Sequence, residues 1–278
     1  MSMRLMAVND GDTATLTSTS FLSTLPVTNL QLEGRTLVAR TTNATGTKTI
    51  NGNFSGVTVV RACILYGHNL SGTASWRLRL YDGASQTGTI VYDSGTDTPN
   101  PPIGWGGFSW GSAPWGTSTL FASWERQYFA NYSNSVQALS FKIDITDASN
   151  PYGYIQAKRL LIGNYFEPTV NIGYGASVYW EDNSQQRRTQ GGSIRTDARV
   201  RYRVAAGNLQ RLDASERAAF MEALRTAGMR NEIFFTLYPE YGGVIERDHS
   251  LIGKLTAMPK ITTSQPSNWT GEFRIEEV

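Results

Sequence analysis

The sequence predicts a mainly β protein with one packed α-helix near its C-terminal end. Thr, Ser and Asn are frequent and there are 27 glycines, a composition that favours strands and turns over helices. Short β-branched and aromatic runs, separated by turn residues, recur over the first 170 residues, as in a sandwich or jelly roll. Helical periodicity is clearest over residues 214–227.

Three parts of the chain are expected. Within residues 1–24, threonines alternate with small or apolar residues over 13–20, which predicts a polar terminal arm or edge strand that frays or pairs with a neighbour. Residues 25–168 form the β-sandwich. Residues 169–278 form a second β-rich, sandwich-like domain that contains the helix.

In the first domain, strands are predicted where apolar and polar residues alternate or β-branched residues cluster. The clearest is Ser75–Tyr81, where Trp76 and Leu78 point to one face and Arg77 to the other. The expected strands are Thr36–Thr42, Thr47–Ile50, Val57–Tyr66, Ser75–Tyr81, Ile90–Asp93, Ala138–Ile145 and Arg159–Ile162.

A segment rich in Trp, Gly and Pro interrupts this domain at residues 98–124, which contain no charged residue. Trp105, Trp110 and Trp115 recur every five residues, a spacing that fits neither a strand nor a helix. We expect a long ordered loop. Its tryptophans are candidate carbohydrate ligands, since sugar rings stack on exposed aromatic faces. The alternatives are a loop clamped onto its own domain and a protein contact.

In the second domain, the expected strands are Ala176–Trp180, Ala198–Ala205, Glu232–Tyr238, Gly253–Pro259 and Gly271–Glu276. Between the second and third of them lies the helix. Asp213 is placed as its N-cap, Glu216 completes a capping box, and Gly228 stands where a C-cap glycine belongs.

Arginines cluster in this domain, and they are the candidate interface. Six lie within 17 residues: Arg187, Arg188, Arg195, Arg199, Arg201 and Arg203. In Arg199–Val204 the arginines should share one face, with Val200, Tyr202 and Val204 on the other. The face is either solvated or matched to an acidic neighbour, such as Glu272, Glu276 and Glu277 of an adjacent subunit. Reversing the charge of Arg201 would then block assembly without unfolding the chain.

Two parts of the chain resemble structural proteins of tailed bacteriophages. The stretch TNLQLEGRTLVART…VTVVRACILYGHNLSGTASWRLRLYDG is similar to the galactose-binding-like jelly rolls of tail and baseplate proteins. The stretches RLLIGNYFEPTVNIGYG, RRTQGGS, LDASERAAFMEALRTAG and FRIEEV resemble tail-associated proteins, including the distal tail family. In that family the ring-forming domain comes first, whereas here the jelly roll is expected first.

The resemblance implies a structural component of a phage tail tip or baseplate. Family members form hexameric rings that join the tail tube to the hub and fibres, and a closed ring needs two different complementary surfaces on each subunit. The location implied is the virion tail, after assembly in the bacterial cytoplasm. The alternative function is a carbohydrate-binding module that aids host adsorption through a surface glycan.

Composition and motifs argue against other classes. The net charge of +2 does not indicate a nucleic-acid binder, and no apolar run suggests a secretory signal or membrane insertion. No metal, phosphate or nucleophile-elbow motif occurs, so neither cofactor nor catalysis is expected. Asp93 and Asp97 are more simply a turn than a Ca²⁺ site or glycosidase pair. Cys63, in an apolar run, should be buried.

Overall fold

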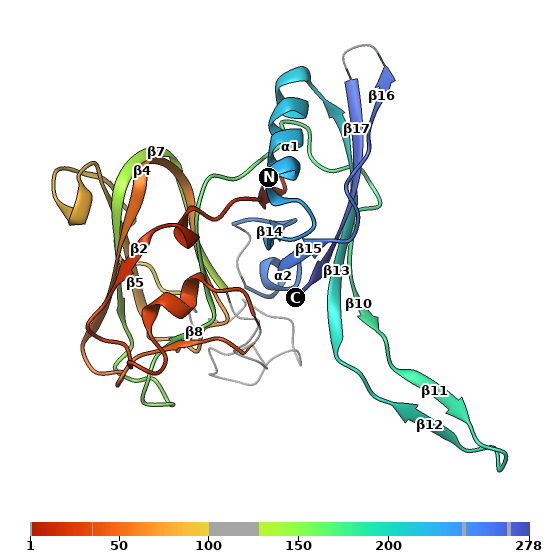
Figure 1. Ribbon diagram of the computed structural model, residues 1–278, viewed down its shortest axis with the longest axis horizontal. Helices are drawn as coiled ribbons and strands as arrows, with labels where there is room; N and C mark the ends of the chain where they lie inside the picture. Colours follow the sequence, from red (N-terminus) through yellow and green to blue (C-terminus); the bar gives the residue numbers. More distant parts are fainter. Residues whose placement is uncertain (1, 35, 100–127, 241–242, 266–267) are drawn as a thin grey trace, which may run out of the picture. The chain divides into compact units, whose positions relative to one another are not determined.

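The computed structural model describes residues 2–34, 36–99, 128–240, 243–265 and 268–278. It is mainly β, with antiparallel sheets and one long helix, as the sequence predicts. The chain divides into two compact units (Figure 1). The sandwich unit is Val8–Tyr165, and the split unit combines Met1–Ala7 with Phe166–Val278. The chain therefore starts in the split unit, builds the whole sandwich unit and then returns.

The sandwich unit is built around two long antiparallel strands, β4 (Thr47–Tyr66) and β7 (Tyr128–Thr146). The first half of β4 pairs with β2, and its second half pairs with β9. The second half of β7 pairs with β5, which pairs with β6. The remaining bounds are β2 Thr15–Thr17, β3 Ala39–Arg40, β5 Ser75–Tyr81, β6 Ile90–Asp93, β8 Gln156–Ala157 and β9 Arg159–Gly163. Three short 3-10 turns are η1 Asp10–Asp12, η2 Val27–Gln31 and η3 Ala84–Gln86.

β5 and β6 have the predicted bounds, but β4 joins two strands that the sequence separates. The polar stretch 51–56 suggests a turn, yet it continues the strand. A Cβ at Gly52 would overlap the ring of Phe141, so glycine serves a close approach there rather than a turn. Irregular pairing with β7 between Asn53 and Thr58 lets the long strand bend.

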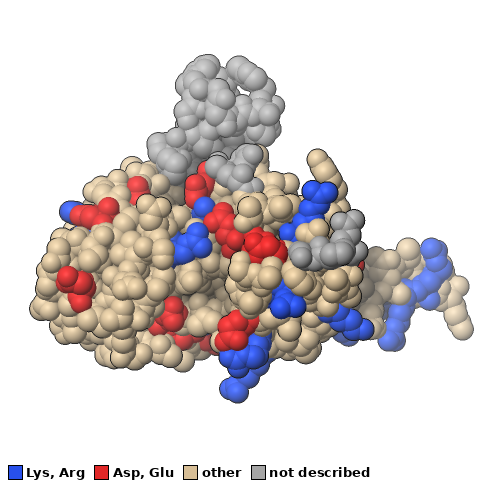
Figure 2. Space-filling model, turned by 90° about the horizontal axis from the view of Figure 1, so that it is seen from above, with Lys and Arg blue, Asp and Glu red and all other residues tan. Residues whose placement is uncertain are grey.

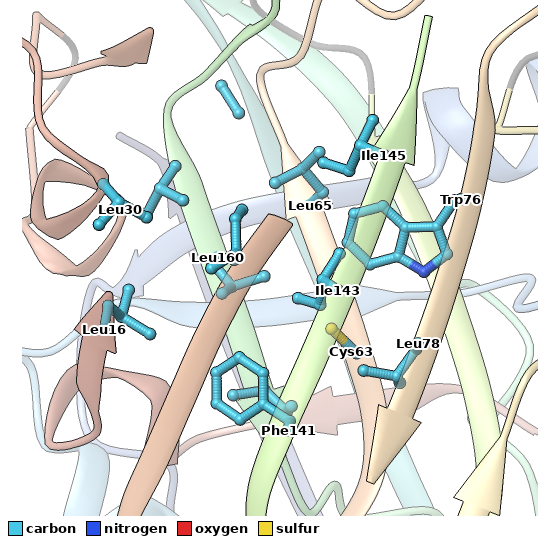
Figure 3. Close-up of a cluster of buried hydrophobic side chains, with 14 of the residues drawn as sticks. Leu16, Leu30, Cys63, Leu65, Trp76, Leu78, Phe141, Ile143, Ile145 and Leu160 are labelled. Atoms are coloured by element: carbon cyan, nitrogen blue, oxygen red, sulfur yellow. The ribbon is translucent and has the colours of Figure 1, made fainter. Parts of the chain in front are cut away.

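A continuous apolar core holds the sandwich unit together. Figure 3 shows Trp76 and Leu78 from β5 beside Ile143 and Ile145 from β7. The predicted inward face of β5 is therefore confirmed. Cys63, on β4, is fully buried in the same cluster, and burial raises the pKa of its thiol. It fills space in the core, as expected.

The split unit is one antiparallel sheet with two helices. Its strands run in the order β1-β14-β15-β17-β13-β10, and β16 also pairs with β17. The strand bounds are β1 Arg4–Met6, β10 Ser177–Asp182, β13 Arg201–Leu212, β14 Ile233–Thr236, β15 Ser250–Leu255, β16 Ile261–Gln265 and β17 Asn268–Glu277. The helices are α1 (Ala214–Ala227) and α2 (Gly243–Asp248). A separate hairpin, β11 (Gln185–Arg188) with β12 (Ile194–Asp197), lies between β10 and β13 in sequence.

Helix α1 has the predicted bounds and caps. Asp213 accepts a hydrogen bond from the Glu216 backbone N–H at 2.7 Å, and the Glu216 carboxylate accepts one from the Asp213 backbone N–H at 3.0 Å. Gly228 ends the helix with a positive φ of 57°. Phe220 and Leu224 bury the inner face of the helix in the core of the split unit.

Residues 1–24 do not form a free arm: β1 and β2 are paired edge strands, the alternative that the sequence also predicts. β1 pairs with β14, and Met3 and Leu5 are fully buried in the core of the split unit. Residues 15–17 form β2 of the sandwich unit. The three-residue strand β1 is too short to show an alternating hydrophobic pattern in the sequence. Its hydrophobic residues are buried by strands more than 200 residues later in the chain. This first strand also places part of the split unit before the sandwich unit.

Candidate functional site

The most exposed structured part of the split unit is a hairpin, which we call the arginine hairpin (residues 183–199). β10 and β13 lead into it, and it extends beyond the rest of their sheet (Figure 1). Every residue from 185 to 200 is exposed. The turn is closed by the Thr189 N–H to the Ser193 carbonyl at 2.8 Å, with Gly192 at φ +83°. A two-stranded hairpin with no core behind it is only marginally stable alone.

The register of the arginine hairpin brings like charges together. Arg187 pairs directly with Arg195, so both side chains lie on the same face. Within the described part of the chain, neither has an ion pair within 4.0 Å, and the one hydrogen bond of Arg188 goes to the Gly192 carbonyl at 2.9 Å. Directly opposed like charges destabilise a strand pair. Figure 2 shows basic side chains gathered along this projecting part, at the right of the view.

The arginines at the base of the hairpin differ, because each has a carboxylate of its own chain. Arg201 is 71% exposed and lies 3.0 Å from Asp182 on the paired strand, and Arg199 lies 3.8 Å from Asp197. Reversing the charge of Arg201 would therefore also break an internal pair. The prediction that Arg199 to Arg203 share one exposed face is wrong.

Arg203 departs most clearly from the predicted arginine face, since its side chain is only 3% exposed. It donates to Glu277 from Nη2 at 2.6 Å and from Nε at 3.1 Å, and to the Arg247 carbonyl from Nη1 at 2.8 Å. On the face opposite the arginines, Val204 is buried but Val200 is exposed. β13 begins only at Arg201, so Val200 lies outside the strand, and the Glu277 carboxylate on neighbouring β17 allows Arg203 to be buried. Glu277 is therefore not available to an adjacent subunit.

A surface hollow of about 770 Å³ lies on the split unit, over β13, β17 and residues 256–262. Among the described residues, two acceptors in it lack partners: Asn208 Oδ1 is buried and accepts no hydrogen bond, and Glu272 is exposed with no ion pair within 4.0 Å. Fully exposed Tyr174 and partly exposed Met258 line it too, and Lys260 adds a cation. No sequence pattern marks Tyr174 or Asn208, which the fold of the sheet brings together.

The other sequence-predicted candidates have structural roles or lie outside the described part. Trp105, Trp110 and Trp115 are outside the described residues. Asp93 binds Arg77 and the Gly95 N–H, which is an Asx turn, and Asp97 accepts from Asn131 at 2.8 Å. Within the described ranges, no three His, Cys, Asp or Glu residues gather as a metal site, and no helix is long and apolar enough to span a membrane.

The two histidines each pack into the fold. His68 is completely buried in the sandwich unit, and burial lowers its pKa to about 3, so the imidazole is neutral. Its Nδ1 accepts the Leu70 N–H at 3.3 Å, which supports the turn after β4. His249 packs edge-on against Tyr238 and shares a hydrogen bond of 2.8 Å with the Ile245 carbonyl. Both histidines are therefore held in place by packing and hydrogen bonds within the fold.

No family model and no curated protein matches this chain. Among solved structures, it is similar to CpGH89CBM32-5 from Clostridium perfringens, in complex with GalNAc-beta-1,3-galactose (11% identity, TM-score 0.38, 56% of this chain and 98% of that chain). A second is the family 32 module of C. perfringens NanJ with galactose (12%, 0.38, 58% and 98%). A third is chitosan-binding module 1 from Paenibacillus sp. IK-5 (12%, 0.39, 56% and 99%). At this level of similarity they assign neither a function nor a ligand to this chain.

Proposed function

We propose that this chain is a structural, non-enzymatic subunit that self-associates through its arginine hairpin, in the tail tip or baseplate of a bacteriophage. The single observation that carries the self-association is the Arg187–Arg195 pair, which is exposed and without a carboxylate in the described chain. Its place in a virion tail rests on the sequence resemblance. Hexameric rings and contacts with tail tube, hub and fibres belong to the same proposal.

The surface that would receive the hairpin is the hollow around Glu272. Its exposed acceptor, the Glu272 carboxylate, matches guanidinium donors, and exposed Tyr174 offers an aromatic face to a cation. The hairpin and hollow are different surfaces of one subunit. Repeating their contact gives a head-to-tail interface, which closes into a ring when the rotation allows.

The experiment is sedimentation velocity with negative-stain imaging of the wild-type chain and of Arg187→Glu/Arg195→Glu. The proposal expects oligomers for the wild type and monomers for the variant, and weaker wild-type association at high salt because the contact is between charges. Arg230→Glu is the control, since Arg230 is another exposed arginine of the split unit. Unchanged oligomers in the double variant would contradict the proposal.

A second candidate function is carbohydrate binding by the segment 98–124, favoured by three tryptophans in an uncharged sequence. The test is a glycan array that includes galactose, the sugar in complex with the NanJ module. Binding that is lost in Trp105→Ala/Trp110→Ala/Trp115→Ala would support it, whereas binding that survives the triple change would contradict it.

A further inference from the structure

The loop between β7 and β8 of the sandwich unit carries an aromatic surface that the functions above do not use. Tyr152 is 56% exposed at its tip. The Tyr152 ring centroid lies 6.1 Å from that of Tyr154, and the guanidinium carbon of Arg40 lies 4.2 Å from the centre of the Tyr154 ring. We call Arg40, Tyr152 and Tyr154 the tyrosine patch. It combines two aromatic faces with one cation.

Buried polar contacts hold this loop from below. Asp147, almost fully buried, accepts from the Ser71 N–H at 2.9 Å and from Asn150 Nδ2 at 2.8 Å. Asn150 Nδ2 also donates to the Asn69 carbonyl at 2.9 Å, and Asn69 Nδ2 donates to the Tyr154 carbonyl at 3.0 Å. A loop fixed in this way loses little further entropy when a ligand binds, so the tyrosine patch is preorganised.

Among the described residues, the Arg40 guanidinium donates hydrogen bonds from only two of its three nitrogens. Its Nε and Nη2 donate to Gln156 Oε1 at 3.1 and 2.8 Å, which fixes the plane of the guanidinium. In the described part of the chain, Nη1 donates no hydrogen bond, and no carboxylate lies within 4.0 Å of the Arg40 guanidinium. A half-buried guanidinium with an open edge prefers an anionic acceptor.

The small size of the tyrosine patch favours a single ring as its ligand. A stable protein interface covers about 800 Å² on each partner. The other exposed large apolar side chains described in this unit lie on other segments: Val8, Leu32, Val57, Ile90 and Val91. Within its own loop, Tyr152 is the one large apolar side chain that is exposed among the described residues. A sugar ring presents one apolar C–H face and polar edges, which fits a tyrosine beside a donor.

We propose that the tyrosine patch binds a carboxylated saccharide, with a sugar face on Tyr152 and the carboxylate on the open edge of Arg40. This goes beyond self-association and uses a different unit of the chain. It is also separate from the tryptophans of segment 98–124. Both groups of the ligand are needed: the ring supplies contact area, and the charge supplies the discrimination against neutral sugars.

The test is isothermal titration of the full chain with galacturonate, glucuronate and sialyl oligosaccharides and with their neutral counterparts. The expected result is that at least one carboxylated sugar binds at least tenfold more tightly than its neutral counterpart. Tyr152→Ala and Arg40→Gln should each weaken that binding at least tenfold. Tyr152→Phe keeps the aromatic face and should retain it, and Tyr179→Ala, an exposed tyrosine of the split unit, should leave it unchanged.

Three results would overturn the proposal. One is that no carboxylated sugar binds, or that neutral sugars bind equally well. Another is that Tyr152→Ala has no effect while changes at Trp105, Trp110 and Trp115 abolish binding, which assigns the sugar to the other segment. The third is that Tyr152→Ala lowers the sedimenting mass and leaves sugar affinity intact, which makes the patch a protein contact. Since Tyr152 is exposed, its substitution tests binding in a folded chain.

Discussion

The arginine hairpin and the paired strands β10 and β13, from which it extends, contain arginines in opposite electrostatic surroundings. On β13, Arg203 is buried and donates to Glu277, and Arg201 lies beside Asp182. On the hairpin, Arg187 and Arg195 face each other, and neither has an ion pair in the described residues. Arginine count alone therefore does not identify an interface. The informative arginines are those that the folded chain leaves without a carboxylate, because they remain available to a carboxylate of another subunit.

The comparison predicts the largest effect for the buried pair. Arg203→Met should lower the free energy of unfolding by about 3–5 kcal/mol, because Glu277, only 5% exposed, would keep a buried charge without its guanidinium. Urea unfolding followed by circular dichroism measures this. Arg187→Met is the matched control and should leave the midpoint almost unchanged. Equal midpoints for the two variants would remove the distinction between the two sets of arginines.

The next effect concerns a buried group that the fold keeps neutral. His68 has a pKa of about 3 when folded and about 6.5 when unfolded, so its contribution to stability is complete above pH 6.5 and decreases as the pH falls. Between pH 6.5 and pH 5, protonation of His68 in the unfolded chain should lower the free energy of unfolding of the wild type by about 2 kcal/mol.

His68→Gln lacks this proton, and its unfolding free energy should fall less over the same range. Urea titrations at several pH values compare the two chains. The titration of carboxylates is common to both, so a parallel loss of stability would show that His68 does not titrate as described.

The smallest effect on folding should come from the hairpin itself. Arg187→Glu replaces a like-charged pair by an opposite-charged one, so the monomer should be as stable as the wild type or slightly more so. Thermal unfolding at low protein concentration measures the monomer, because association adds stability of its own. A clear loss of monomer stability would mean that Arg187 has a structural partner within the chain.

Local signals in the sequence predicted many elements well. The capping box at Asp213, the alternation of Ser75–Tyr81 and the apolar setting of Cys63 each depend on neighbouring residues, and all agree with the structure. Strand boundaries were less predictable where tertiary contacts decide them. β15 begins at Ser250 rather than Gly253, because Ser250 and Leu251 pair with β14 and are buried.

What the sequence could not supply is long-range pairing. The burial of Arg203 depends on Glu277, 74 residues later, and the burial of Leu5 depends on pairing with β14, more than 200 residues later. The tyrosine patch joins Arg40 to a loop more than 100 residues away. No local period records these contacts, so the sequence located the arginine cluster but neither the hollow nor the tyrosine patch.

The most direct test of self-association is a charge exchange between the hairpin and the hollow, read out as solution mass by analytical ultracentrifugation. Arg187→Glu/Arg195→Glu and Glu272→Arg should each give monomers, because each puts like charges across the contact. Combining all three changes in one chain restores opposite charges and should restore the wild-type oligomer. A combined variant that stays monomeric, or a wild-type chain that is itself monomeric, would contradict the account.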